Sequence, residues 1–516
     1  MTGDVTWLVP LVVVLPLVGA GIALAAAGHT AVQRAVSMTI LVLVLVIAAV
    51  LLYAADRSGP QVVQVGGWLP TEGIVLVVDR LSALMVIVSV VVTIAVLGYS
   101  IGQGRSSFDE ESDGQAPLPV FHPTLLVLSA GVSTTFVSGD LFHIYVGFEM
   151  LLAASFVLLT LGGTESRVRA GVTYVFVSLL SSLIFLMAIA IIYAATGTIN
   201  LALLAGRLSE LPTGTSIAIH LLLILGFCTK AAVFPMSGWL PDSYPTAPAP
   251  VTAVFAGLLT KVGIYSLIRT ETLLFPGREL DTLLLCAALL TMLVGILGAI
   301  VQDDLKRMLS FTLVSHIGYL LFGIGLGSQA ALSAAIFYTI HHITIQTTLF
   351  LVTGLIERVG GSTAAAQLGG LARLSPLLGV LFFIPALNLA GIPPFSGFLG
   401  KVGLIQAGVN DGSFIAWAVV CGSVVTSLLT LYAVARVWGR AFWSEPHEMV
   451  PTAPGGMGQP RALSAGLVIP TAALVTVGLL LTAAAGPVYD LTARAAADLL
   501  SSTPYLTAVL GAGATP

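Results

Sequence analysis

The sequence predicts an all-α polytopic membrane protein with about 14 transmembrane helices. Hydrophobic residues make up 57% of the 516-residue chain and charged residues only 9%, and the mean hydropathy is +1.03. So few polar groups could not cover the surface of a soluble globular protein. Apolar runs of about 20 residues, the length that crosses a bilayer, recur along the chain. Runs such as 40–52 lack the alternation of a membrane β-barrel strand, so the spans are expected to be helices.

The first segment could be mistaken for a signal peptide, but it lacks a basic start, carries Asp4 and is long enough to cross, which indicates a retained helix. Three cysteines fall within spans without metal-site spacing, so disulfides and zinc are not expected. In chain order the predicted spans are 6–27, 34–55, 74–101, 122–138, 140–161, 169–195, 217–235, 248–270, 280–301, 308–326, 330–356, 375–408, 414–441 and 462–486.

The distribution of arginine and lysine between alternate loops predicts the orientation. With the N-terminus outside, eleven basic residues fall on the inner side and six on the outer side, and the other three are lysines within spans. Both termini are therefore expected outside the cell membrane. The stretches 102–121 and 444–461 are expected as inner loops, and the acidic run at 109–113 is either a solvated loop or a docking point for a partner chain. The net charge of −4 indicates no nucleic-acid partner.

Two proline-rich segments, 228–250 and 385–401, are incompatible with continuous helices. Proline removes a backbone donor and clashes with the preceding turn, and the freed backbone groups must face protein or water. Both segments contain Pro-x-Ser-Gly-aromatic-Leu, at 235–240 and at 394–399, with the prolines 159 residues apart. Five spans separate the two breaks, and an odd number gives equivalent elements opposite orientations. The pattern predicts two inverted five-helix repeats, each with a helix broken near the midplane.

These features divide the chain into four parts. Residues 1–110 would hold helices 1–3, 111–275 the first repeat (helices 4–8), 276–443 the second, inverted repeat (helices 9–13), and 444–516 an inner loop, helix 14 and a tail. The tail after residue 487 is weakly amphipathic, and we expect it either to lie on the membrane or to dock on a neighbouring chain.

Ionisable residues within the spans indicate a path for protons. Lys230, Lys261 and Lys401 lie inside apolar stretches. Arginine keeps its proton at any accessible pH, whereas a lysine in an apolar interior can release one, so these lysines are predicted proton carriers. For Lys261 and Lys401 the alternative is a side chain that reaches to the membrane interface. Glu149, halfway along the fifth span, is the expected ion-pair partner of Lys230. Separation of the pair would release the proton, although the pair could also serve only to fix helix packing.

Histidines supply further titratable groups. His316, His341 and His342 lie within spans and titrate in a range that suits a proton relay. A hydrogen-bonded core position is the alternative for His316. Adjacent residues point in different directions on a helix, so at most one of His341 and His342 is expected to face the lysines. The charged cluster at 303–307 is a solvated loop or, alternatively, the point where protons enter.

We find no nucleotide, flavin, haem or iron–sulfur pattern, and the sequence predicts neither a cofactor nor a metal site.

The segment that starts at Lys230 and continues Ala-Ala-Val-Phe-Pro-Met-Ser-Gly-Trp-Leu-Pro-Asp-Ser-Tyr-Pro-Thr-Ala-Pro-Ala-Pro resembles the signature of the proton-translocating antiporter-like family. This family includes membrane subunits of respiratory complex I, related hydrogenases and the Mrp-type multisubunit Na⁺/H⁺ antiporters. Further matches extend the resemblance over about 75–440, and the length and compact plan look most like the Mrp branch. They lie at 148–150, 260–265, 304–319 and 395–401.

The resemblance implies roles for the charged residues and for partner chains. Glu149 and Lys230 would form a paired switch, Lys261 and the histidines would continue a central hydrated axis, and Lys401 would sit at the final half-channel. Smaller membrane subunits and a larger antiporter-like subunit would complete the assembly. In one departure, Gln346 stands where relatives commonly have a lysine. Glutamine cannot store a proton, so the path would run through a histidine such as His341 or through bound water.

The expected function is therefore proton translocation across a cell membrane, coupled to outward sodium movement by a whole complex. Sodium is implied by the resemblance alone. Sodium prefers oxygen ligands, no intramembrane cluster of carboxylates is evident, and Asp140 by itself is insufficient. The alternatives are a proton-pumping subunit of a redox-driven complex and a scaffold without a transport role.

Overall fold

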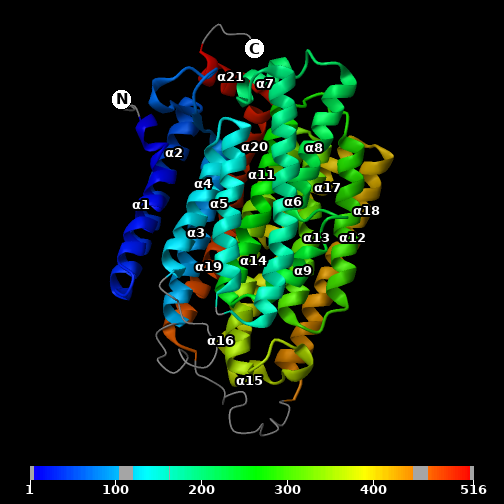
Figure 1. Ribbon diagram of the computed structural model, residues 1–516. Helices are drawn as coiled ribbons and strands as arrows, with labels where there is room; N and C mark the ends of the chain where they lie inside the picture. Colours follow the sequence, from blue (N-terminus) through cyan, green and yellow to red (C-terminus); the bar gives the residue numbers. More distant parts are fainter. Residues whose placement is uncertain (1–4, 104–119, 162, 446–462, 512–516) are drawn as a thin grey trace.

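The computed structural model describes residues 5–103, 120–161, 163–445 and 463–511, which form a bundle of helices running mostly between two opposite ends (Figure 1). The acidic run at 109–113 and the part of the second predicted loop at 446–461 lie outside these ranges. The α-helices are α1 (Leu11–Ala25), α2 (Thr30–Ser58), α3 (Arg80–Gln103), α4 (Phe121–Val137), α5 (Leu141–Thr160), α6 (Glu165–Thr196), α7 (Leu201–Arg207), α8 (Thr213–Ala231), α9 (Trp239–Ser243), α10 (Ala249–Val254), α11 (Thr260–Leu273), α12 (Asp281–Ile300), α13 (Leu305–Leu326), α14 (Gln329–Gly360), α15 (Leu371–Leu374), α16 (Pro376–Ala390), α17 (Ser396–Asp411), α18 (Phe414–Val437), α19 (Ala465–Ala483), α20 (Ala485–Ser501) and α21 (Thr503–Leu510). The other elements are β1 (Gln61–Gln64), β2 (Val75–Val78), the 3-10 turns η1 (Thr6–Leu8), η2 (Val65–Gly67), η3 (Tyr244–Thr246) and η5 (Ala365–Gln367), and the π-helices η4 (Phe255–Leu259) and η6 (Trp438–Trp443).

Within the described ranges, twelve helices are long and apolar enough to cross a membrane, so the chain is a multi-pass membrane protein. Each overlaps one of the fourteen predicted segments, and several extend beyond its predicted ends. Two shorter apolar helices, Phe121–Val137 and Pro376–Ala390, occupy the remaining two segments.

A short β-hairpin replaces the start of the predicted span at 74–101. β1 and β2 pair in antiparallel fashion with Gln61 opposite Val78, and helix α3 begins only at Arg80. The apolar run at 74–78 directly precedes an apolar helix, and periodicity cannot distinguish a short buried strand from a helical turn. β-branched valines and the length of four residues were the available signals for a strand.

Both predicted helix breaks are present. Helix α8 ends at Ala231, the next residue Ala232 has a positive φ of 59°, and α9 follows only at Trp239. The predicted span at 375–408 is two helices, since α16 ends at Ala390 and α17 begins at Ser396. The peptide bonds that precede Pro235 and Pro394 are both cis.

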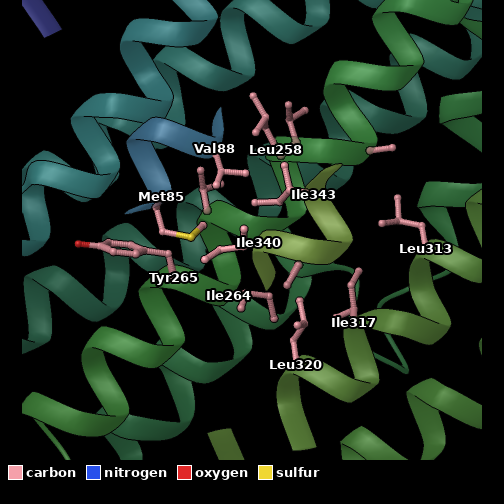
Figure 2. Close-up of a cluster of buried hydrophobic side chains, with 14 of the residues drawn as sticks. Met85, Val88, Leu258, Ile264, Tyr265, Leu313, Ile317, Leu320, Ile340 and Ile343 are labelled. Atoms are coloured by element: carbon pink, nitrogen blue, oxygen red, sulfur yellow. The ribbon is translucent and has the colours of Figure 1, made fainter. Parts of the chain in front are cut away.

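Helix α14 is the centre of the bundle and packs against α3, α10, α13, α16, α17, α19 and α20. Aliphatic side chains from α3, η4, α11, α13 and α14 meet there, as Figure 2 shows for Met85, Leu258, Leu313 and Ile343. This core surrounds the middle of the bundle, so a charged group placed there is separated from bulk water by several helices.

The C-terminal tail packs on its own chain. The Ser333 and Thr492 hydroxyls are 3.0 Å apart between α14 and α20, and the ring of Tyr489 packs on Phe337. Helix α21 contacts β1 and α7, and η1 also contacts β1. Both described ends of the chain therefore lie at one end of the bundle, called the terminal end below, whereas α15 lies at the opposite end (Figure 1).

Two facing glycines permit a close crossing of α3 and α19. A Cβ on Gly102 would lie 2.2 Å from the carbonyl oxygen of Gly466. We expect Gly102→Val to push α19 away from α3 and to destabilise the protein by about 1–3 kcal/mol, because backbone atoms cannot yield as a side chain would. The thermal midpoint of the detergent-purified protein measures this. Gly21→Val, at a position with no neighbour within 4 Å, is the control, and equal midpoints for the two variants would contradict the prediction.

Candidate functional site

Lys230 lies next to last in α8, directly before the first break, and is 3% exposed. Its Nζ has no hydrogen-bond partner among the described residues and lies 5.8 Å from the centroid of the Phe148 ring. Glu149, the neighbour of Phe148 on α5, interacts electrostatically with Lys230, but the two are not in salt-bridge contact. Glu149 is partly exposed, although its Oε1 is buried and unpaired within the described residues. The predicted pair is therefore close, with neither charge neutralised by direct contact.

Lys261 is fully buried beside a π-helix. Its Nζ donates a hydrogen bond of 2.6 Å to the carbonyl oxygen of Ala256, which lies in η4. A π-helix widens the turn and is typical of functional positions in helices. Gly263, two residues later, lets α11 approach the end of α8, since a Cβ there would lie 2.8 Å from the Phe227 carbonyl oxygen and 3.0 Å from the Ala231 nitrogen. The close approach brings the helix of Lys261 against the helix of Lys230.

Lys401 is held by the second break. Its Nζ donates to the carbonyl oxygens of Leu389 (3.2 Å) and Ala390 (3.0 Å), the last two residues of α16. Carbonyls at a helix C-terminus have no partner within the helix and form the negative end of its dipole, so they suit an ammonium group. Nζ also lies 4.9 Å from the centroid of the Tyr319 ring. Lys401 is 3% exposed, so its side chain ends inside the bundle rather than at an interface.

The three histidines form one buried group between α13, α14 and α17. His316 and His342 stack with ring centroids 5.3 Å apart, and the Tyr338 hydroxyl lies 2.8 Å from His316 Nδ1. His341 Nδ1 lies 3.0 Å from Ser396 Oγ at the second break. Among the described residues, Nε2 of all three rings has no hydrogen-bond partner.

Both members of the adjacent pair face titratable groups, whereas the sequence favoured at most one. His342 interacts electrostatically with Lys261 and Lys401, and His341 interacts with Lys401. The reason is that α14 is enclosed on all sides, so different directions on this helix lead to different parts of the same interior.

Gln346 takes no direct part in the histidine group. Its Nε2 donates a 2.7 Å hydrogen bond to the carbonyl oxygen of Leu309, and its Oε1 has no partner among the described residues. Sequence reasoning missed Tyr338 and Tyr319, whose rings lie 5.5 Å apart between His316 and Lys401. Tyr338 stands three residues before His341, one turn away on the same helix face, and this spacing was the available signal.

The charged cluster at 303–307 does not pair within itself. Lys306 forms a 2.7 Å ion pair with Glu357, Arg307 pairs with Asp242 at 2.8 Å, and Asp303 pairs with Arg440 at 3.0 Å. The Asp304 side chain accepts a hydrogen bond from the backbone nitrogen of Arg307 and caps α13. These residues tie the N-terminal end of α13 to neighbouring elements.

The fold is thus that of a multi-pass membrane protein whose helix bundle encloses lysines and histidines, beside two helix breaks and the π-helix η4. The profile of the family described as NADH:quinone oxidoreductase/Mrp antiporter, transmembrane, matches residues 138–428, and the chain belongs to this family.

Relatives match over nearly the whole chain. The chain is 37% identical to the Na⁺/H⁺ antiporter D subunit from Alkalihalophilus pseudofirmus, over 98% of this chain and 99% of the relative. It is 34% identical to the Na⁺/H⁺ antiporter D subunit from Bacillus subtilis, over 97% and 98%. A chain in the structure of the Mrp complex from Dietzia sp. DQ12-45-1b superposes with a TM-score of 0.89 and 33% identity, over 99% of this chain and 100% of that chain. A chain of an archaeal membrane-bound sulfane sulfur reductase shares the fold, with a TM-score of 0.87 and 24% identity over 97% and 99%.

Gly397 permits the close contact between the second break and His341. A Cβ at this position would lie 2.0 Å from the Asn388 carbonyl oxygen and 3.0 Å from His341 Nε2. We expect Gly397→Ala to displace α17 from α16 and to lower the thermal midpoint. The destabilisation should be about 1–3 kcal/mol. Gly439→Ala has no neighbour within 4 Å and should behave like the unmodified protein; the same behaviour of Gly397→Ala would refute the expected contact.

Proposed function

We propose that the chain is the proton-translocating subunit of a multisubunit Na⁺/H⁺ antiporter, a transporter and not an enzyme. The observation that carries the proposal is the 37% identity with a Na⁺/H⁺ antiporter D subunit over almost the full length of both chains. The buried lysines supply the chemistry, because lysine can release a proton inside an apolar bundle and arginine cannot.

Glu149 and Lys230 act as the switch that loads the path. They lie close to each other without salt-bridge contact, and the unpaired Lys230 Nζ is buried. When the two side chains approach, the carboxylate stabilises the ammonium ion, and when they separate, the uncompensated ammonium ion in an apolar site tends to lose its proton. A small movement at the first break, directly after Lys230, is enough to change this distance.

The proton then moves from Lys261 through the histidines to Lys401. His342 and His316 lie between the two lysines, and the Tyr338 hydroxyl joins His316 to the group around His341. Several nitrogens along the path lack a protein partner among the described residues, and buried polar groups of this kind commonly bind ordered water. Water at these atoms would bridge the gaps, and Gln346 Oε1 can accept from such water without carrying a proton itself.

The proposed path runs through a bundle of 14 transmembrane helices that includes two inverted five-helix repeats. The matching breaks before α9 and before α17 support the repeats, which would comprise 111–275 and 276–443, flanked by 1–110 and 444–516. The lysines do not follow the 159-residue offset of the prolines, because Lys401 lies seven residues after Pro394 and Lys261 lies 26 residues after Pro235. The repeats therefore share a backbone plan and differ in where each carries its lysine.

The partially exposed position of Glu149 supports work inside an assembly. A carboxylate halfway along a span is costly against lipid, so a neighbouring membrane subunit is expected to cover it. Small membrane subunits and a larger antiporter-like subunit are the proposed partners, in the cell membrane with both termini outside, where exchange would serve pH and sodium homeostasis. The route of sodium would lie elsewhere in the complex.

Replacing Lys230 with arginine separates proton transfer from charge. Lys230→Arg keeps the positive charge but cannot release its proton, so we expect sodium-driven proton exchange in inverted membrane vesicles to fall about tenfold or more. Lys306→Arg is the matched control, because Lys306 is ion-paired with Glu357 away from the path, and its exchange should stay near the unmodified rate. If Lys230→Arg exchanges at the unmodified rate in an assembled complex, the pair with Glu149 only fixes packing and the proposed switch is wrong.

The composition of the native assembly tests the antiporter against a redox-driven pump. Several small hydrophobic subunits should co-purify with the tagged chain in mild detergent. Mass spectrometry identifies them. Flavin-containing or iron–sulfur subunits among the stoichiometric partners would move the assignment to a respiratory or hydrogenase complex.

A further inference from the structure

A column of polar side chains continues from Lys261 along α11 toward the terminal end. Tyr265 and Arg269 follow at intervals of four residues, so the three side chains occupy neighbouring positions on the helix surface. The Tyr265 hydroxyl donates a 2.6 Å hydrogen bond to the carbonyl oxygen of Phe136 and accepts one of 3.2 Å from Arg269 Nη2. Figure 2 shows its ring beside aliphatic side chains with the hydroxyl oxygen pointing away from them.

The column ends in a buried ion pair. Arg269 Nη1 lies 2.6 Å from Asp79 Oδ2, and Asp79 Oδ1 accepts hydrogen bonds from the nitrogen (2.9 Å) and the hydroxyl (2.6 Å) of Ser82. The Arg269 guanidinium also lies 5.3 Å from the centroid of the Tyr505 ring on α21. A small pocket at the terminal end is lined by Asp79, Arg269, Tyr505 and Asp498. Water in this pocket would be next to Asp79 and Arg269, the members of the column nearest the terminal end.

The charge state of Asp79 suits a proton acceptor. Burial by itself raises the pKa of Asp79, but the Arg269 guanidinium and the two hydrogen bonds from Ser82 hold it below its usual value. The carboxylate is therefore ionised at neutral pH. The other titratable groups that face this pair are Tyr265 and Tyr505, with Asp498 across the pocket.

We propose that Tyr265 and Asp79 connect Lys261 with water at the terminal end, with Arg269 as a fixed charge that keeps its own proton. This inference rests on the proposed function, because it needs Lys261 to carry a proton. The Tyr265 hydroxyl turns from the Phe136 carbonyl toward the Asp79 carboxylate and gives it the hydroxyl proton, while the Lys261 ammonium gives a proton to the Tyr265 oxygen. Lys261 becomes neutral, Tyr265 is unchanged, and the protonated Asp79 then releases the proton to water in the pocket. The reverse sequence loads Lys261.

The first step requires Lys261 to move. Its Nζ is bonded to the Ala256 carbonyl in the structure, toward the other end of α11. A four-carbon stem lets the ammonium swing by several ångströms toward the next turn, where Tyr265 stands. Lys261 thus exchanges between one position facing the histidines and one facing Tyr265, and it connects the histidine group to the terminal end.

The competing explanation is that Asp79 and Arg269 form a purely structural ion pair. A substitution at Tyr265 distinguishes this explanation from the proposed proton path. Tyr265→Phe removes one hydroxyl and leaves both charges of the Asp79–Arg269 pair in place. Tyr174→Phe is the matched control, since Tyr174 is also buried and its hydroxyl lies 2.6 Å from Ser155 Oγ, outside the column. The paired neutral replacement Asp79→Asn with Arg269→Gln is the second variant, because it leaves no unpaired buried charge.

The experiment measures sodium-driven proton exchange from pH 6 to 9 in inverted vesicles that carry the whole complex, with subunit content checked by mass spectrometry and Lys230→Arg as the reference. We expect Tyr265→Phe and the paired variant to lose at least about tenfold in rate with the complex intact, and Tyr174→Phe to keep its rate and its pH profile. If Lys230→Arg is inactive but Tyr265→Phe exchanges within twofold of the unmodified rate, this inference is wrong and the proposed function stands. If Lys230→Arg retains full exchange, the proposed function fails and this inference fails with it. Should the paired variant not assemble, Tyr265→Phe decides alone.

Discussion

Three ammonium groups buried in an apolar bundle are the constraint on which the arrangement of the helices depends. An ion without oxygen partners in such a site costs several kcal/mol, and the charged neighbour of Lys230 is Glu149, a partly exposed carboxylate that makes no salt bridge with it. Lys261 and Lys401 instead receive backbone carbonyl oxygens, from a π-helix in one case and from the end of a broken helix in the other. Regular α-helices have no carbonyls to spare in their interiors, so the lysines require the irregular backbone.

The irregular backbone in turn requires protection from lipid. Asn388 accepts a 2.9 Å hydrogen bond from the Gly397 nitrogen across the second break, and the Thr482 hydroxyl on α19 accepts one of 3.0 Å from the Ser396 nitrogen. The peripheral helix α19 therefore satisfies a backbone donor that the proline break leaves free. Packing around α14 and hydrogen bonding at the breaks are linked, because the same helices that exclude lipid also supply hydrogen bonds to the backbone groups that the breaks leave free.

Much of this could be predicted from the sequence. Apolar runs located the spans, and the prolines at 235 and 394 located both breaks, because a missing donor must interrupt a helix wherever it lies. The buried lysines stood out by their surroundings. The hydrogen-bond partners of the lysines could not be predicted, because Ala256, Leu389 and Ala390 contribute backbone oxygens, which every residue type has. Tyr338 and Tyr265 were missed because a tyrosine in an apolar run is ordinarily a core residue, and its role depends on where the hydroxyl ends.

The partners of the charged residues differ between the ends and the middle of the bundle. At the ends, Arg307 and Lys306 are paired with carboxylates, so loss of a proton from Lys306 would leave Glu357 without its counter-charge. In the middle, the hydrogen bonds that Lys261 and Lys401 make within the described part of the chain go to neutral carbonyls. A proton can leave either of them without stranding a negative charge in an apolar site, and the neutral amine keeps a donor for the same oxygens. A carbonyl site therefore tolerates both charge states of lysine, whereas a salt bridge stabilises one. This difference explains how a residue can be held in place and still change its charge.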